Sequence, residues 1–321
     1  MTPVPSSGGR VPSRHFRSAK FDFGSFLFSS LTGLATLLIL TILVIILLNI
    51  LVNGMRGLSW HFISTIPKKD FFDLDTTGVL PMIVGTAVRV LVMTIFVIPV
   101  GVITAIYLTE YAASSSPFTR IIRAAVNNLA GVPSIAFGLF GLGFFINFIG
   151  KNLDVLLRNP EPVWGQPALI WASLTLAVMT LPVVIVATEE SLRAIPQGLR
   201  EASLALGATK LETILKVVLP QALPGIMTGG ILAVSRAAGE VAPILFTGVA
   251  YYMANLPHKL SDQFMDLGYH VFVLSTQSPN IEQTRPILYA TVLVLLALTF
   301  ALNFVAIIIR SRVRKKLRGL G

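Results

Sequence analysis

The sequence predicts an all-α membrane protein with six transmembrane helices. Of its 321 residues, 54% are hydrophobic and only 12% are charged, and the mean hydropathy is +0.78. Soluble domains carry about 25% charged residues, so this composition is typical of a chain that lies mostly in a lipid bilayer. The apolar residues form long runs without the strict alternation of a membrane β-strand, which favours helices.

Six apolar segments are each long enough to cross the membrane as a helix. A hydrocarbon core of about 30 Å needs about 20 residues at about 1.5 Å per residue. The expected spans are residues 26–52, 79–108, 124–150, 167–187, 223–250 and 287–309. A break in the third span is expected at Pro133, because proline removes a backbone donor and kinks a helix. The GxxxG pattern of Gly225 and Gly229 predicts a close helix contact in the fifth span.

The first span is interpreted as a retained anchor rather than a cleaved signal peptide. Its apolar run is about twice the usual 7–15 residues, and no Ala-x-Ala site follows it. Residues 1–25 contain proline, serine and glycine together with four basic residues, which predicts a disordered basic cytoplasmic tail. The expected organisation is this tail, a transmembrane domain over residues 26–310 and a second basic cytoplasmic tail over residues 311–321.

The distribution of lysine and arginine predicts that both ends of the chain are cytoplasmic. With this orientation, the inside segments hold 16 of the 25 basic residues and the outside loops hold seven, as the positive-inside rule requires. The net charge of +10 is therefore mainly a sign of topology. The basic run from Arg310 to Arg318 is expected to contact anionic lipid rather than nucleic acid.

The chain lacks the residue patterns of common enzyme and metal sites. It contains no cysteine, no phosphate-binding Gly-x-x-x-x-Gly-Lys-Ser/Thr loop and no His-Glu-x-x-His pattern. The four histidines are scattered over the tail and the outer loops, where each is expected to be solvated: His15, His61, His258 and His270. We therefore expect no catalytic site, no metal site and no bound ATP in this chain itself.

Three charged side chains lie within the predicted spans. Arg236 and Glu240 lie near the middle of span five, and their spacing of four places them on one face of a helix. Arg89 lies inside span two. A charge at the middle of a bilayer costs about 2.5–3.5 kcal/mol on insertion scales, so each needs a partner or a polar path. A structural ion pair and a transport pathway are both open interpretations.

The segment 189–220 is a polar insert between two apolar spans. Small residues followed by glycine allow the surface of another protein to approach the backbone closely. The residues that give this segment its pattern are Glu201, Ala202, Ser203, Gly207, Leu219 and Pro220. We expect a polar helix–turn–helix on the cytoplasmic side that docks a partner protein.

This pattern resembles the signature loop of ABC importer permeases, which reads Glu-Ala-Ala, three residues, Gly, nine residues, Ile, one residue, Leu-Pro. The chain departs from it only in Ser203, for the second alanine, and Val217, for the isoleucine. The segments 129–140 and 235–246 are further similar to the phosphate-uptake permeases, and specifically to their A-type subunit. The resemblance covers roughly residues 25–310.

The resemblance implies a type I ABC importer permease (MetI-like) fold in the bacterial inner membrane, with the Glu-Ala-Ala loop as a coupling helix. It implies four kinds of partner: a homologous C-type permease, two ATP-binding subunits that would hold ATP and Mg²⁺, an extracytoplasmic phosphate-binding protein, and membrane lipid. By the same resemblance, Arg236 and Glu240 match an intramembrane charged element proposed to influence phosphate passage. Arg89 is a pathway candidate from its depth alone.

Three alternatives stay open at this point. Sulfate and molybdate permeases share the loop and a similar charged element, so the anion is not settled. An anion transporter or channel driven by an ion gradient would account for six spans and buried charges, but not for the spacing of the Glu-Ala-Ala loop. A phosphate-sensing membrane subunit is the third. The outer segments 54–78 and 251–285 are the candidate contacts for a binding protein.

Overall fold

The computed structural model describes residues 23–67, 77–113, 115–253 and 255–318. Most of the expected N-terminal tail and residues 68–76 of the first outer segment lie outside this range. Within it, six helices are long and apolar enough to cross a membrane, so the predicted all-α class with six spans is confirmed. The sheet content of the described residues is a single bridge between Val249 and Phe264.

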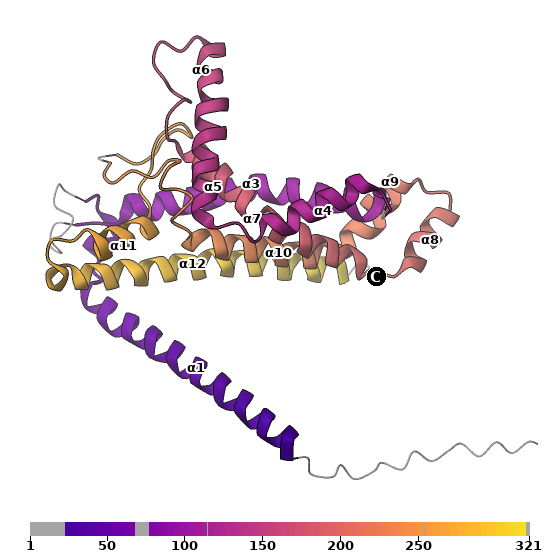
Figure 1. The fold of residues 1–321 in the computed structure, drawn as a ribbon, viewed down its shortest axis with the longest axis horizontal. Helices are drawn as coiled ribbons and strands as arrows, with labels where there is room; N and C mark the ends of the chain where they lie inside the picture. The colour runs from indigo at the N-terminus through magenta and orange to yellow at the C-terminus, as the bar shows by residue number, and fades with distance from the viewer. Residues whose placement is uncertain (1–22, 68–76, 114, 254, 319–321) are drawn as a thin grey trace, which may run out of the picture. The chain divides into compact units, whose positions relative to one another are not determined.

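Twelve α-helices and three π-helical segments make up the described part of the chain (Figure 1). In order they are α1 (Phe23–Gly57), α2 (Trp60–Ser64), α3 (Leu80–Ile106), η1 (Tyr107–Tyr111), α4 (Pro117–Leu129), α5 (Ser134–Phe140), η2 (Gly141–Gly150), α6 (Lys151–Leu157), α7 (Leu169–Arg193), α8 (Gln197–Ala205), α9 (Lys210–Thr213), η3 (Ile214–Val218), α10 (Leu219–Gly239), α11 (Leu267–Thr276) and α12 (Ile281–Arg318). The first helix begins at Phe23, three residues before the predicted edge.

The chain divides into two compact units, Met1–Asn49 and Ile50–Gly321. The described part of the first unit is the N-terminal part of α1, whose side chains are exposed along nearly its whole length. Its exposed leucine, isoleucine and phenylalanine side chains suit a helix surrounded by lipid tails.

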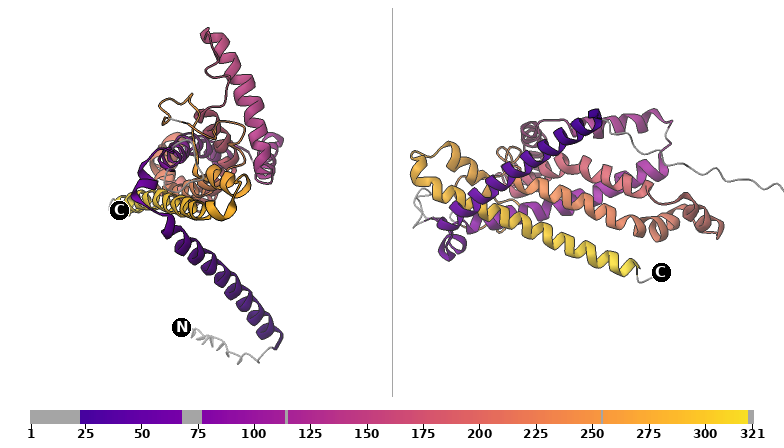
Figure 2. Two further views of the ribbon diagram at one scale, coloured as in Figure 1. Left: turned by 90° about the vertical axis from the view of Figure 1, so that its left-hand side faces the viewer. Right: turned by 90° about the horizontal axis from the view of Figure 1, so that it is seen from below.

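The second unit is built around α3, α7 and α10, with α12 packed on α10 (Figures 1 and 2). Val90 and Met93 of α3, Leu176 of α7 and Ala233 of α10 belong to one buried apolar cluster. Of the six spans, α7 is buried over the largest share of its apolar window. This core fixes the positions of α3 and α10, which carry the charged residues singled out in the sequence.

The GxxxG pattern makes the predicted close contact, between α10 and α7. A methyl group at Gly229 would lie 2.6 Å from Cβ of Ala187, and one at Gly225 would overlap Oγ of Ser191. Any larger residue at these two positions would push the helices apart, because the interior has no free space to absorb it.

The third span begins later than predicted. The expected break is confirmed, because α4 ends at Leu129 and a new helix begins at Ser134, directly after Pro133. The predicted start at residue 124 is wrong, since residues 117–129 form the separate and mostly exposed helix α4. From Ser134 the span continues through α5, η2 and α6, and its far end extends away from the bundle (Figure 1).

The fifth span ends earlier than predicted. Helix α10 stops at Gly239, whereas the sequence predicted a helix to residue 250. Gly239 has no side chain to favour the helix, and Pro243 cannot donate the next backbone hydrogen bond. Glu240 is consequently extended, with φ −82° and ψ 124°, and the chain continues in turns to Val249.

The outer segment 251–285 contains a partly buried helix that the sequence did not predict. Helix α11 packs against α12 and α3. His270, expected to be solvated, is 5% exposed within it, so that expectation is wrong. Helix α12 also extends beyond both predicted edges of the sixth span, from Ile281 to Arg318.

Candidate functional site

Arg236 and Glu240 form an ion pair at the end of α10. Nε of Arg236 lies 3.5 Å from Oε1 of Glu240, and the two side chains are 42% and 25% exposed. Arg236 makes no other hydrogen bond or ion pair with the described residues. Partly exposed pairs of this kind contribute little stability, about 0–1 kcal/mol. The remaining guanidinium N–H groups can therefore bind an anion without the loss of a strong contact.

Arg89 is placed differently from the other two. Its side chain is fully buried, and Nη2 lies 2.8 Å from Oδ2 of Asp266, which is equally buried. Nη1 also donates to the carbonyl oxygen of Ala237 at 2.9 Å. Arg89 reaches the end of α10 through the backbone, and among the described residues Asp266 is its one carboxylate partner. In this conformation it faces protein rather than a solvated path.

Asp266 is the principal site residue that sequence reasoning missed. It lies in Phe264-Met-Asp-Leu-Gly-Tyr-His, an apolar stretch with one carboxylate. An isolated acid in such a stretch must find a partner if it is buried. The sequence therefore carries this signal, but it places the stretch in an expected outer loop, where a carboxylate needs no partner.

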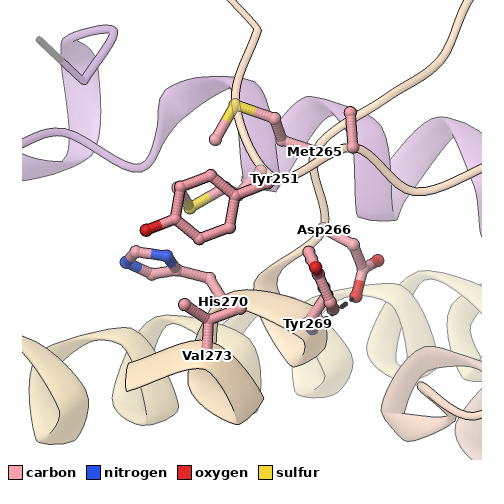
Figure 3. A pocket seen from close by; sticks show the side chains of 8 residues that line it. Tyr251, Met265, Asp266, Tyr269, His270 and Val273 are labelled. Carbon is pink, nitrogen blue, oxygen red and sulfur yellow. Dashed lines mark hydrogen bonds between the residues drawn. The ribbon is translucent and has the colours of Figure 1, made fainter. Parts of the chain in front are cut away.

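Figure 3 shows Asp266 together with its neighbours on α11. Tyr251 and His270 face one another across a cavity of about 10 Å³, which is no larger than a water molecule requires. The Asp266 carboxylate points away from His270, and Oδ1 accepts a hydrogen bond from the backbone N–H of Tyr269 at 3.2 Å. Asp266 is thus the N-cap of α11 as well as the partner of Arg89.

The polar insert 189–220 forms the helix–turn–helix expected from the sequence. Helix α8 ends at Ala205, and Gly207 follows with φ +86°, a left-handed conformation that glycine adopts without strain. Thr209 and Glu212 form a capping box that begins α9. The hydroxyl groups of Ser203 and Thr213 share a hydrogen bond of 2.9 Å, which closes the two arms.

The two ends of the signature pattern differ in exposure. Glu201, Ala202 and Gly207 are exposed, whereas Leu219 and Pro220 are partly buried where the loop enters α10. Pro220 lacks the N–H that a regular helix needs, and the π-helical segment η3 precedes it. The exposed half of the pattern is therefore available to another protein, and the other half anchors it to a membrane span.

Arg200 ties this insert to the body of the protein. Its Nη2 donates to Oε1 of Glu110 at 2.9 Å and to the carbonyl oxygen of Leu192 at 2.8 Å. Nη1 donates to the carbonyl oxygen of Ile195 at 2.7 Å. Arg200 and Glu110 are 12% and 10% exposed. Helix α8 is therefore fixed to the end of α7 and, through Glu110, to η1 at the end of span two.

The chain is similar to known membrane transport proteins. Residues 97–319 match the family described as binding-protein-dependent transport system inner membrane component. The probable ABC transporter permease protein YqgI of Bacillus subtilis is 35% identical over 215 residues, which is 67% of either chain. The phosphate transport system permease protein PstA of Mycobacterium leprae is 40% identical over 168 residues, 52% of this chain. That match spans 50% of the PstA sequence.

The fold also resembles a solved ABC transporter. A structure of the MetNI methionine ABC transporter in an inward-facing conformation has a TM-score of 0.51 at 21% identity, over 74% of this chain and 94% of the other. The six spans and this likeness show the type I importer permease fold. The chain belongs to the family of binding-protein-dependent transport system inner membrane components. The predicted resemblance to A-type permeases is confirmed by its PstA relatives.

Proposed function

We propose that this chain is the A-type transmembrane subunit of an ATP-driven importer of inorganic phosphate. It would form half of the translocation pathway and pair with a homologous C-type permease. Two ATP-binding subunits would dock on the cytoplasmic side, and a phosphate-binding protein would deliver the anion from outside. ATP, Mg²⁺ and the hydrolysis step belong to the docked ATPase. In this arrangement both termini of the chain are cytoplasmic. The names of the PstA relatives support the choice of phosphate.

The observation that best supports docking is the surface of the helix–turn–helix. Leu206 is 90% exposed, Leu211 is 56% exposed and Leu204 is 47% exposed. Leu204 and Leu206 lie beside Gly207 in the polar insert, before the candidate membrane span that begins at Lys210, and Leu211 lies in the first turn of that span. Clustered apolar side chains outside the membrane are typical of a protein–protein interface. An ATPase groove that covers them would remove this apolar area from water.

The proposed mechanism is alternating access. Closure of the ATPase dimer on ATP moves the docked helix α8, and Arg200 transmits that movement to η1 and α7. The spans then reorient, the pathway opens outward, and phosphate passes from its carrier protein. Arg236 balances the negative charge of the anion during passage. Glu240 holds the guanidinium in place when the pathway is empty and releases it readily, because their pair is half-exposed and weak.

The test of the pathway is Arg236→Gln in the assembled complex. A charged hydrogen bond is worth about 1.5–3 kcal/mol, so we expect phosphate flux to fall by about tenfold to a hundredfold while the subunits still copurify. Arg120→Gln is the control, since it removes the charge of an arginine outside the proposed pathway, whose Nη2 donates to the carbonyl oxygen of Ser115 at 3.2 Å. Unchanged flux in Arg236→Gln would leave only a structural role for the Arg236–Glu240 pair.

A further inference from the structure

A cluster of three buried polar side chains joins three helices at the end of α10. The cluster consists of Thr86 and Arg89 of α3 and Asp266 at the start of α11, and all three are buried. Oγ1 of Thr86 donates to Oδ2 of Asp266 at 2.9 Å and accepts from the N–H of Leu267 at 3.0 Å. Arg89 donates to the same carboxylate oxygen at 2.8 Å. We refer to these residues as the Arg89 cluster.

The arginine of this cluster caps the C-terminus of α10. It donates to the carbonyl oxygens of Ala237 at 2.9 Å and of Ala238 at 3.4 Å. The last carbonyls of a helix have no partner within the helix, and a cation there interacts favourably with the helix dipole. Arg236 and Glu240 flank the capped residues. The Arg89 cluster therefore determines where the backbone holds the Arg236–Glu240 pair.

Asp266, the carboxylate of this cluster, lies at the start of α11, at the opposite end of the bundle from the helix–turn–helix of α8 and α9. Figure 1 shows α11 at one end and α8 and α9 at the other. Helix α11 lies in the segment predicted to face outside, and it carries exposed side chains such as Phe272, 40% exposed. Asp266 is both the N-cap of α11 and the ion-pair partner of Arg89. Any displacement of α11 must consequently move the carboxylate that holds Arg89.

One atom of the cluster is not satisfied. Nε of Arg89 is buried and has no hydrogen-bond partner among the described residues. A buried donor without a partner costs free energy, and such groups are rare in native structures. The remaining guanidinium nitrogens are bonded to Asp266 and to the end of α10. An arrangement of these helices that brought an acceptor to Nε would remove this cost at the expense of the present contacts.

We propose that the Arg89–Asp266 pair is a positioning device that couples α11 to the charged end of α10. When an extracytoplasmic partner shifts α11, Asp266 moves with it. The hydrogen bonds of Arg89 to the carbonyl oxygens of α10 then change, and the Arg236–Glu240 pair changes position. Arg89 and Asp266 are then positioning residues and do not themselves touch the anion. This inference rests on the proposed function, because it assigns a way for the binding protein to act on the pathway.

The test uses the assembled complex in proteoliposomes, with the loaded binding protein added from outside. Asp266→Asn keeps the size of the side chain and the cap of α11 but removes the charge that holds Arg89. Arg89→Lys keeps the charge but loses the planar fork that reaches Asp266 and α10 together. Three quantities are measured: copurification of the subunits, basal ATP hydrolysis, and ATP hydrolysis stimulated by the loaded binding protein.

We expect both variants to assemble and to retain basal hydrolysis, while stimulation by the binding protein falls by about tenfold, within the usual range of coupling between sites. The apparent KM for the loaded binding protein should change less than the maximal rate. Asp154→Asn is the matched control. Asp154 is also a buried aspartate, whose carboxylate accepts backbone N–H groups of Val163 and Trp164, away from α10. Asp154→Asn should lower thermal stability and leave the ratio of stimulated to basal ATP hydrolysis unchanged.

Several outcomes separate this inference from the proposed function. If Asp266→Asn behaves like Asp154→Asn, with lower stability and full stimulation, the positioning role is refuted. If Asp266→Asn does not assemble, Thr86→Val decides the question, because it removes the hydrogen bond to the same carboxylate and the one from the N–H of Leu267 but no charge. A smaller but definite fall in stimulation would support the role, and full stimulation would refute it. A wild-type complex stimulated by another anion would refute only the proposed substrate, and the variants are then compared with that anion.

Discussion

Gly207 offers a way to separate backbone strain from protein docking in the helix–turn–helix. Its φ of +86° lies in the left-handed region, and a Cβ there would have no atom within 4 Å. Gly207→Ala therefore meets no steric clash and costs only strain, about 1–2 kcal/mol. That strain shifts the population of this loop conformation by about 5–30-fold. The remainder of the loop is held by the Ser203–Thr213 hydrogen bond and the capping box, so the change stays local.

Larger substitutions at the same position add the effect of a side chain in the docking surface. Asparagine tolerates the left-handed conformation better than other non-glycine residues, so Gly207→Asn adds bulk with little strain. Gly207→Glu adds strain, bulk and charge. If an ATPase approaches this glycine closely, Gly207→Asn and Gly207→Glu should both abolish copurification of the ATPase and ATP-driven uptake. Gly207→Ala should weaken them by no more than the strain allows.

The assay is copurification of the ATPase with each variant, with membrane insertion and thermal unfolding of the permease measured in parallel. Normal copurification and uptake with Gly207→Glu would refute docking at this loop. Loss of docking in Gly207→Ala with normal docking in Gly207→Asn would show that backbone conformation, rather than close approach, is what the partner requires.

Three further predictions concern the stability of the fold, each measured by thermal unfolding of the purified protein. Arg89→Leu leaves Asp266 buried and unpaired and should destabilise the protein by about 3–5 kcal/mol; a loss below about 1 kcal/mol would contradict the buried ion pair. Gly229→Leu should destabilise the fold and separate α10 from α7, whereas Gly143→Leu, at a glycine with open space around it, should be tolerated. Burial lowers the pKa of His270, outside the six spans, from 6.5 to about 4. The unfolded state then binds more protons between these values, so stability should fall by about 3 kcal/mol as the pH drops from about 6.5 to about 4, and His270→Leu should remove this dependence.

The sequence predicts the long helices well because their signal is local. An apolar run that must satisfy its own backbone in lipid has no alternative to a helix, and this accounts for α1, α3, α7 and α12. The break at Pro133 was predictable for the same reason, since a missing N–H acts at one position. The GxxxG contact of Gly225 and Gly229 was also predictable, because the absence of a side chain is visible in the sequence.

The end of α10 and the whole of α11 depend on contacts that are distant in the sequence. Apolar residues continue past Gly239, and for this reason the predicted fifth span extends to residue 250. The backbone nevertheless leaves the helix at Gly239. Asp266 and Arg89 are 177 residues apart. Nothing in the sequence around either residue indicates which charged residue is its partner in the ion pair. The pairing of Arg236 with Glu240 was predictable from spacing, whereas the burial of Arg89 beneath the end of α10 was not.

The most direct measurement of the central claim is uptake of labelled phosphate, sulfate and molybdate at micromolar concentration in cells that lack this chain. Uptake is compared with that of cells in which the chain is restored, with ATP depleted in a parallel sample. We predict that only phosphate uptake is lost, that the restored chain recovers it, and that the recovery requires ATP. Loss of sulfate or molybdate uptake instead, or phosphate uptake that persists when ATP is depleted, would contradict an ATP-driven phosphate permease.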